Sequence, residues 1–387
     1  MLKELFLSKK SMVSYSSETI DILRLIRSEN VGPRTFANLI KLFGSPKVAI
    51  DHIAEFSVRG GRLKPIKVFT ESEAKKELAL LEQNEFGLVT YKSSEYSKLL
   101  LEISDFPPIL SYKGNIELLK SNKSIAIVGA RNASVNGRAF ASKISKELME
   151  QNYIVVSGLA RGIDTAAHTV DPAKTIAVLA GGIDHIYPAE NSNLYKQISE
   201  QGLIIAELPI RSKPLSQHFP QRNRLISGLS LGTVIIEASL KSGSLITAKA
   251  ALDQNREVFA VPGFPLDPRC QGTNKLIKEG AYLVETVDDI IANVPNYEKI
   301  IESVDDSAGD NNSFRSFIDN NPQDQVTNLM RKEVLDLLSA SPIDLNSLMQ
   351  ATNLSLPILY TIILELELAR KIVRYPGNKI SLIDFVL

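Results

Sequence analysis

The chain of 387 residues contains a single cysteine, Cys270, and no tryptophan. One cysteine cannot form an intrachain disulfide, which excludes a disulfide-stapled fold. The four histidines are scattered, and neither a Cys-x-x-Cys pair nor a His-Glu-x-x-His motif occurs, so the sequence predicts no zinc or other metal site. Stability must therefore come from a hydrophobic core, for which a chain with 44% hydrophobic residues is well suited.

Long apolar runs and an excess of charge of either sign are also absent. No apolar run reaches the roughly 20 residues that span a bilayer, and charges interrupt the first residues where a signal peptide would be apolar. We therefore expect a cytoplasmic protein without a membrane partner. Lys plus Arg and Asp plus Glu are equal at 44 each, so nucleic-acid binding would have to depend on clustered basic residues rather than on overall charge.

Residues 18–85 have a helical pattern, with apolar side chains recurring at helical spacing. Gly32 allows a tight turn between two of these helices, and Pro33 suits the first turn of the second. Such a turn is either a plain structural hairpin or, as in helix-hairpin-helix units, a way of aiming backbone N–H groups at a DNA phosphate. The sequence predicts an N-terminal helical domain and leaves both interpretations of the turn open.

From residue 86 to residue 292, short β-rich runs alternate with helical stretches. Several runs are almost continuously apolar, as expected of strands that are buried on both faces. The fold class is therefore α/β, with a Rossmann-like, doubly wound and mostly parallel sheet. The nine expected strands cover residues 87–91, 109–112, 124–128, 154–157, 175–180, 203–206, 233–236, 257–261 and 281–284.

The residue composition changes twice in the last part of the chain, at residues 293 and 329. Residues 293–328 are rich in Asp, Asn and Ser and have little to bury, which predicts a flexible linker that tethers the next domain loosely. Residues 329–387 show three helical patterns followed by a hairpin, the order of a small winged-helix domain. Ser355 is the expected cap of the third helix, and Pro376-Gly377-Asn378 the expected hairpin turn.

Glycines follow three successive strands of the expected sheet. Gly129-Ala-Arg131 follows the first and Ser157-Gly158 the second, with Arg161 close behind; the third ends in Ala-Gly-Gly. Ligands of open α/β sheets bind at such strand ends, where helix N-termini favour anions, although the glycines could equally serve only as turns. Because Gly-x-Gly-x-x-Gly spacing is absent, we predict no dinucleotide or other cofactor.

Asp164 and His168, four residues apart on the helix after the second strand, are better explained as an ordinary helix contact than as a catalytic pair.

A basic segment over residues 211–224 holds four fixed cations and no acid, with Phe219 among them. Arg and Lys neutralise phosphates, and an aromatic ring stacks on a base, which is worth about 1–3 kcal/mol per base. The alternative is a solvated basic loop with Phe219 tucked into the core. Lys241-Ser-Gly243-Ser, ahead of a later helix, is another anion-binding turn, but it lacks the spacing of an ATP-binding loop.

Taken in order and spacing, these motifs resemble those of the DNA-processing protein A (DprA/Smf) family over roughly residues 106–289. The matching segments are Gly129-Ala-Arg131, Ser157-Gly-Leu-Ala-Arg-Gly-Ile-Asp164, Thr175-Ile-Ala-Val-Leu-Ala-Gly-Gly-Ile-Asp184 with Tyr187-Pro188, Phe219-Pro-Gln-Arg-Asn-Arg224, Lys241-Ser-Gly-Ser244 and Val258-Phe-Ala-Val-Pro-Gly263. The flanking domains resemble those of family members too. Ala180-Gly181-Gly182, where the family commonly has Gly-x-Gly, and the short segment before Thr175 depart from the pattern.

The resemblance implies a non-enzymatic protein that binds single-stranded DNA, forms a homodimer and loads the RecA recombinase onto DNA covered by single-strand-binding protein during natural transformation. It assigns DNA contact to Arg131, Ser157, Gly158, Phe219, Arg222, Asn223, Arg224, Lys241 and Gly243. Arg161, which lies within the segment that ends at Asp164, and Lys213, which precedes the Phe219 segment, are expected as further contacts.

Two other functions fit parts of the sequence. Phosphoribohydrolases on a similar fold also have Gly-rich strand ends, but they carry a Pro-Gly-Gly-x-Gly-Thr run followed by a catalytic Glu, of which Gly232-Thr233 and Glu237 are a partial echo. A winged-helix regulator would leave the large α/β domain unexplained. Release of free base from nucleoside monophosphates separates the hydrolase from a DNA-binding mediator.

Overall fold

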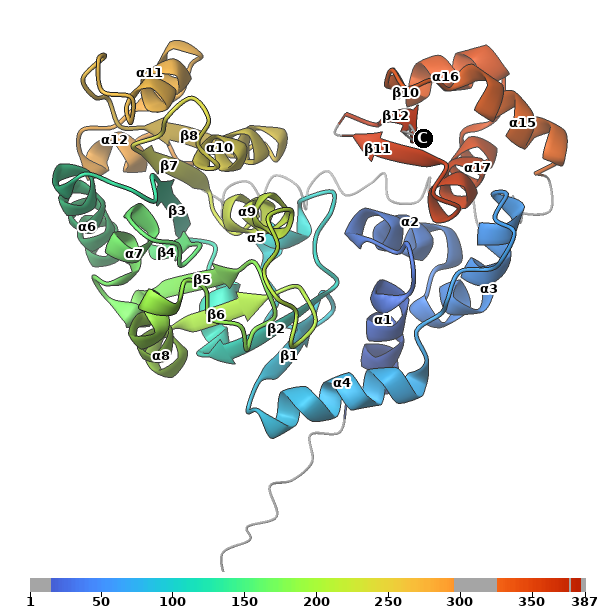
Figure 1. Ribbon diagram of the computed structural model, residues 1–387, viewed down its shortest axis with the longest axis horizontal. Coiled ribbons are helices and arrows are strands. Elements are labelled where there is room, and N and C mark those ends of the chain that lie inside the picture. Colours follow the sequence, from blue (N-terminus) through green and yellow to red (C-terminus); the bar gives the residue numbers. More distant parts are fainter. Residues whose placement is uncertain (1–14, 296–325, 376, 384–387) are drawn as a thin grey trace, which may run out of the picture.

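The computed structural model describes residues 15–295, 326–375 and 377–383 (Figure 1). The N-terminal helices and the winged-helix domain lie together on one side, and the α/β domain lies on the other. Most of the expected linker, residues 296–325, falls outside the described residues, as does Pro376 of the expected hairpin turn.

Four helices form the N-terminal part: α1 (Ser17–Arg27), α2 (Pro33–Phe43), α3 (Pro46–Arg59) and α4 (Glu71–Gln83). Side chains in the local sequence explain where they begin. The hydroxyls of Ser16 and Ser45 accept hydrogen bonds from backbone N–H groups of the first turns of α1 and α3, and Thr70 forms a reciprocal capping box with Glu73 at α4. The sequence had predicted helices over this region, and the structure confirms them.

The α/β domain is built on one nine-stranded sheet in which all nine expected strands are found. They are β1 (Gly87–Thr90), β2 (Ile109–Gly114), β3 (Ser124–Gly129), β4 (Ile154–Ser157), β5 (Thr175–Leu179), β6 (Leu203–Ala206), β7 (Gly232–Ile236), β8 (Glu257–Ala260) and β9 (Tyr282–Leu283). The strand order is β1-β2-β6-β5-β4-β3-β7-β8-β9. β2 pairs antiparallel with both β1 and β6, and all other pairs are parallel.

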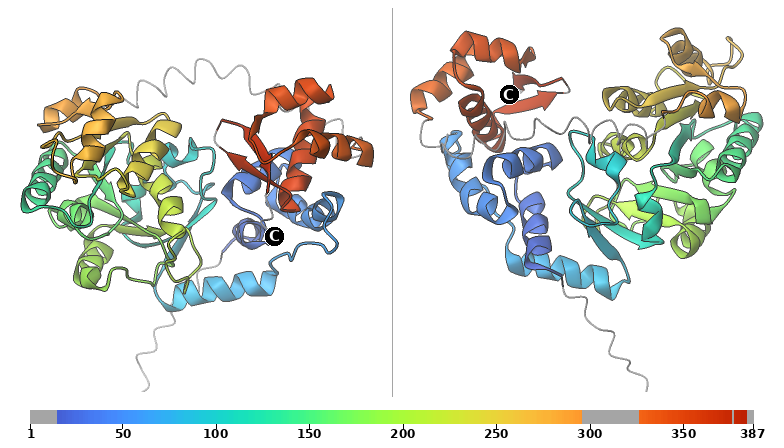
Figure 2. Two further views of the ribbon diagram at one scale, coloured as in Figure 1. Left: turned by 45° about the horizontal axis from the view of Figure 1, so that its top comes forward. Right: turned by 180° about the vertical axis from the view of Figure 1, so that it is seen from behind.

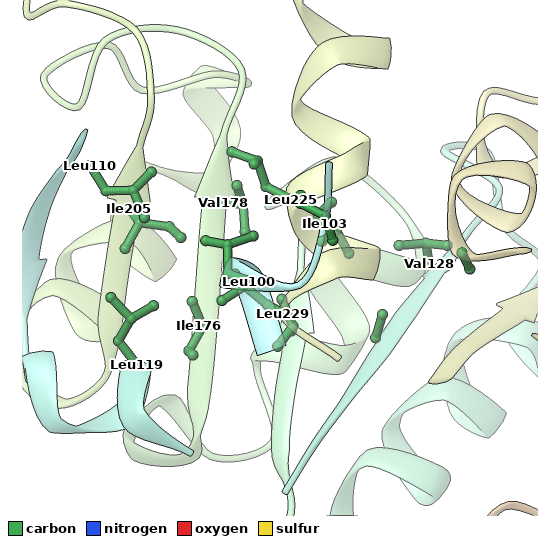
Figure 3. Close-up of a cluster of buried hydrophobic side chains, with 14 of the residues drawn as sticks. Leu100, Ile103, Leu110, Leu119, Val128, Ile176, Val178, Ile205, Leu225 and Leu229 are labelled. Atoms are coloured by element: carbon green, nitrogen blue, oxygen red, sulfur yellow. The ribbon is translucent and has the colours of Figure 1, made fainter. Parts of the chain in front are cut away.

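Helices cover both faces of this sheet because its strands are apolar on both sides. Along β3, Ile125 and Ile127 pack on the face covered by α6, whereas Ala126 and Val128 lie on the face covered by α9 and α10. Figure 3 shows the cluster on this second face, with Val128 and Leu225 among its labelled side chains. The helical segments of this domain are α5 (Lys98–Leu101), η1 (Ile116–Lys120), α6 (Val135–Glu150), α7 (Ile163–His168), η2 (Pro172–Lys174), η3 (Ala189–Asn191), α8 (Ser192–Gln201), α9 (His218–Gly228), α10 (Ser244–Asp253), α11 (Gln271–Lys278) and α12 (Val287–Ile291).

The strand order reverses at the β3/β7 pair. From β3 the chain winds outward through β4, β5 and β6, and it then crosses back to place β7 on the other side of β3. At such a reversal the loops after the two neighbouring strands diverge to opposite faces and leave a crevice at the carboxyl edge of the sheet. The topology therefore directs attention to the segments that follow β3 and β7.

The C-terminal part has the predicted winged-helix order. It comprises α15 (Asn328–Leu337), β10 (Ile343–Asp344), α16 (Leu345–Thr352), α17 (Leu356–Leu368), β11 (Ile372–Tyr375) and β12 (Lys379–Leu382). Ser355 stands at the N-cap of α17, but its side chain makes no capping hydrogen bond.

The expectation that this domain is only loosely tethered is wrong, because α17 packs on the N-terminal helices (Figure 2). Leu364 and Leu368 are buried in the same core cluster as Phe36 and Phe56. Thr35 donates a hydrogen bond to Glu367 across the interface. The physical reason is that α17 is apolar on nearly all sides and therefore buries one face in each of two cores.

Within the described residues, no single helix is long and apolar enough to cross a membrane. Only α16 and α17 together reach that length and composition, and they are bent by 113° against each other. The same residues contain no group of three or more His, Cys, Asp or Glu side chains placed to hold a metal ion.

Candidate nucleic-acid interface

A cleft of about 800 Å³ opens at the carboxyl ends of β3 and β7, where the strand order reverses. Its walls come from the loop after β3, the start of α7, α9 and the turn that leads into α10. The lining residues that matter below are Gly129, Arg131, Asn132, Asp164, Tyr187, Phe219, Arg222, Asn223, Ser242, Gly243 and Arg269.

The floor of the cleft requires a glycine. A Cβ atom at Gly129 would lie 1.8 Å from the carbonyl oxygen of Ile236 in the adjacent strand β7, a distance that no side chain can adopt. The close approach brings the backbone of the β3 loop against β7, and the chain then continues into Arg131, which is exposed to solvent. Gly129 therefore allows β3 and β7 to approach closely just before the chain reaches Arg131.

Arg131 and Phe219 meet across the cleft from different elements. The guanidinium carbon of Arg131, in the loop after β3, lies 4.9 Å from the centre of the Phe219 ring at the start of α9. Tyr187 meets that ring edge-on at 5.6 Å, and 48% of Tyr187 is exposed. The site thus combines a cation with two partly accessible aromatic rings, which suits a ligand that carries both phosphate and a flat base.

Arg222 is buried behind this surface and holds two strand ends together. Its Nη1 donates hydrogen bonds to the carbonyl oxygens of Gly158 and Val178, at 2.6 and 2.5 Å. Gly158 leaves room for the guanidinium, since a Cβ there would lie 2.3 Å from Nη1. Burial lowers the pKa of Arg222 to about 10, a value at which the side chain remains charged at neutral pH.

Asp164 is the carboxylate that accompanies Arg222. It accepts hydrogen bonds from the backbone N–H groups of Gly158 and Ala160, at 3.1 and 3.3 Å. Burial raises its pKa, while Arg222 and these N–H groups oppose the rise. Asp164 therefore fixes the loop between β4 and α7 and is fully engaged in doing so.

His168 also stabilises the loop between β4 and α7. It is completely buried, and its Nε2 accepts a hydrogen bond from the N–H of Leu159, whose φ is +54°, while Nδ1 bonds Thr175. Asp164 and His168 thus each bind the loop backbone rather than act as a catalytic pair. Burial lowers the pKa of His168 to about 3.

We expect His168 to make the protein sensitive to mild acid. An unfolded chain protonates histidine below about pH 6.5, whereas the folded protein resists protonation down to about pH 3, so stability is complete above pH 6.5 and falls as the pH drops below it. Between pH 7.5 and 5.5 this group should cost about 1.4 kcal/mol. Urea unfolding at both pH values measures the loss, and His168→Gln should remove that share. An unchanged pH slope in the variant would contradict this.

Comparison with known proteins shows to which family the chain belongs. The family model described as DNA recombination-mediator protein A matches residues 87–295, more than half of the chain. The chain belongs to the DprA/Smf family. Models of the DprA-like N-terminal HHH domain and of the DprA winged helix domain match residues 16–79 and 320–378.

Individual relatives cover most of this chain. The DNA processing protein DprA of Bacillus subtilis is 41% identical over 56% of this chain and 74% of its own length, and the Smf protein of Escherichia coli is 35% identical over 81% and 82%. The X-ray structure of DprA from Streptococcus pneumoniae superposes with a TM-score of 0.60 at 32% identity, covering 73% of this chain and 99% of that one. A Helicobacter pylori DprA structure, described for its single-stranded DNA binding mode, has a TM-score of 0.50 at 28% identity over 54% and 94%.

The cleft brings together five of the DprA/Smf residues expected from sequence: Arg131, Phe219, Arg222, Asn223 and Gly243. Asn223 donates to the carbonyl oxygen of Gly243 at 3.3 Å and so links α9 to the turn before α10. Gly158 lies in an adjoining recess behind Arg222. Lys213 and Lys241 are exposed next to the lining residues Pro214 and Ser242.

Two expected contacts point elsewhere. Ser157 is fully buried and its hydroxyl donates to the carbonyl oxygen of Ile127, so it joins β4 to β3. Arg161 is exposed but forms an ion pair with Glu190 at 2.6 Å outside the cleft lining. Their motif positions thus reflect loop construction in this structure.

Arg224 corrects the sequence interpretation most clearly. Its side chain is nearly buried on the side of α9 away from the cleft, where Nη2 lies 2.5 Å from Glu207 and Nη1 donates to the carbonyl oxygen of Asp105 at 2.5 Å. Burial alone would lower its pKa, but the carboxylates of Glu207 and Asp105 outweigh burial and raise it. With its donors engaged by protein, Arg224 does not face a ligand in the cleft.

Asn132, Tyr187 and Arg269 are among the lining residues that sequence reasoning did not propose as contacts. Asn132 and Tyr187 stand in or beside the DprA/Smf motifs and could have been proposed from there. Arg269 follows β8 in a loop with no motif, where it pairs with Asp267 at 2.7 Å, so only the tertiary fold places it at the cleft.

Glu237, which partly matches the position of the hydrolase glutamate, has a structural role. Its carboxylate accepts hydrogen bonds from the N–H and the hydroxyl of Ser134, the N-cap residue of α6. It lies outside the cleft lining. Glu237 thus anchors the N-terminus of α6.

Proposed function

We propose that this protein binds single-stranded DNA in the cleft between the ends of β3 and β7 and acts as a recombination mediator. The observation that carries the proposal is Arg131 stacked over Phe219 at the strand-order reversal, beside Asn223. A phosphate can pair with Arg131 while an unpaired base stacks on the accessible aromatic rings. A duplex hides its bases, so it should bind more weakly.

Arg131 is the cation best placed to receive the strand. Among the cleft-lining arginines, Arg222 is buried and donates to the carbonyl oxygens of Gly158 and Val178, and Arg269 pairs with Asp267. Within the described residues Arg131 has no ion-pair partner. Its exposed guanidinium can therefore bind phosphate without first breaking an ion pair.

The wider biological role rests on the family. Its model names a DNA recombination mediator, and the Helicobacter pylori relative is described as binding single-stranded DNA. On that basis we propose that the protein loads RecA onto DNA covered by single-strand-binding protein, works as a homodimer in the cytoplasm, serves natural transformation and catalyses no reaction. RecA filament assembly on covered strands and sedimentation of the full chain are the direct tests.

Replacing Arg131 with alanine should weaken binding of single-stranded oligonucleotides by about 1.5–3 kcal/mol, the value of one charge-assisted contact. The slope of log affinity against log salt should fall by about one phosphate. Fluorescence anisotropy across a salt series measures both, with duplex as comparison. Lys143→Ala, on the exposed face of α6, is the matched control and should bind like wild type. Equal binding by both variants, or salt-insensitive binding, would refute the site.

A further inference from the structure

A second cavity, of about 460 Å³, lies where the three parts of the chain meet. We call it the junction cavity. Its walls come from α2, from α9 and α10 of the α/β domain, and from α16, α17 and the hairpin β11–β12 of the winged-helix domain. The residues used below are Arg34, Asn38 and Lys41 of α2, and Tyr360, Arg374 and Tyr375 of the winged-helix domain.

Two residues that line the junction cavity carry three buried donor atoms with no hydrogen-bond acceptor among the described residues: Nδ2 of Asn38, and Nε and Nη2 of Arg374. The Arg374 side chain is 9% exposed, and its Nε lies 3.1 Å from Glu367. Burial lowers the pKa of Arg374, Glu367 opposes this, and the nearby positive charge of Arg34 lowers the pKa further. Unsatisfied donors beside two like charges favour a ligand with anionic oxygen acceptors.

The remaining groups around the junction cavity narrow the ligand class. Lys41 is exposed and has no ion-pair partner within the described residues, whereas Arg34 is 4.0 Å from Asp105. Asp253 faces the cavity as well and disfavours anions at its side. Tyr375, 39% exposed, and Tyr360 add aromatic surface. The junction cavity thus combines hydrogen-bond donors, cationic side chains and aromatic rings, as the cleft does.

The junction cavity and the cleft lie along the same two helices. At its N-terminal end α10 lines the cleft with Ser244 and Thr247, and at its C-terminal end it lines the junction cavity with Ala250 and Asp253. Ten helical residues span about 15 Å, so a strand of a few nucleotides can extend from one site to the other.

We propose that the junction cavity binds phosphates of a nucleic-acid strand, as a second contact for the single strand held in the cleft. This inference rests on the proposed function of the cleft. It assigns the nucleic-acid contact of the winged-helix domain to the hairpin side, at Arg374 and Tyr375. Helix α17 contributes Tyr360 to the cavity wall, but it packs on α2 and α3 and contains two glutamates and no cation.

Length-dependent binding tests the inference. A fluorescent oligothymidylate of about 6 nucleotides should occupy the cleft alone. One of about 20 nucleotides should occupy both the cleft and the junction cavity. Lys41→Glu should weaken binding of the long strand about tenfold and reduce its salt slope, and leave the short strand unaffected. Lys47→Glu makes the same charge change at an exposed position of α3 outside both cavities and should do neither.

The outcomes separate the two proposals. If the short strand binds and Lys41→Glu leaves long-strand affinity unchanged, or if Lys47→Glu weakens it equally, the junction cavity is not a nucleic-acid site. If Lys41→Glu weakens only a duplex of about 20 base pairs, the single-strand assignment is overturned. If the short strand fails to bind wild type, the proposed function of the cleft fails independently. Melting temperatures of both variants should equal that of wild type.

Discussion

Replacing Arg224 with alanine is expected to destabilise the fold by about 3 kcal/mol while leaving the chemistry of the cleft in place. The substitution leaves the carboxylate of Glu207 without its ion-pair partner. Glu207 is largely buried, and its carboxylate binds Arg224 at 2.5 Å. It also removes a donor from the carbonyl oxygen of Asp105. Breaking a buried ion pair is costly because the remaining charge has lost both its partner and its access to water.

Urea unfolding of Arg224→Ala gives the loss of stability directly. Lys75→Ala is the matched control, because its pair with Glu71 on α4 is exposed on both sides and screened by solvent, so its loss should hardly change stability. At a temperature where the Arg224 variant is folded, its affinity for short oligonucleotides should equal that of wild type. A stable variant with weakened DNA binding would instead restore Arg224 to the DNA contacts.

Removing residues 295–387 should destabilise the N-terminal helices by about 3–6 kcal/mol, since two leucine side chains leave their core. Leu364 and Leu368 are buried against these helices, and Asn30 donates a hydrogen bond to the carbonyl oxygen of Leu368. The core clusters on both faces of the sheet contain no residue of the winged-helix domain. Binding of a short strand in the cleft should therefore survive.

Hydrogen exchange separates the two effects of this truncation. Amides of α1 to α3 should exchange faster, while those of β3 to β7 keep their protection. Leu368→Ala in the full chain should shift the same helices in the same direction, at a cost of about 2–5 kcal/mol. If the truncated protein keeps a protected sheet but loses the short strand, DNA binding belongs to the winged-helix domain and the cleft is wrongly assigned.

Much of the architecture follows from local patterns in the sequence. The sequence predicted the nine strands of the sheet, and it predicted the three helices and the hairpin of the winged-helix domain. These elements were predictable because apolar periodicity and turn residues are local signals, each contained within a few neighbouring residues. The positions of Gly129 and Arg131 at the candidate cleft were predictable because parallel strands bring their carboxyl ends to one edge of the sheet.

Only the tertiary structure showed which arginines of the basic segment, residues 211–224, lie at the cleft. Arg222 and Arg224 are two residues apart, but α9 begins at His218 and turns about 100° per residue, so their side chains leave the helix on opposite sides. One enters the strand ends behind the cleft, and the other reaches Glu207. Likewise, no local pattern shows that α17 docks on α2 and α3. Both outcomes depend on which surfaces meet across long stretches of chain, and residue type and spacing alone do not specify those partners.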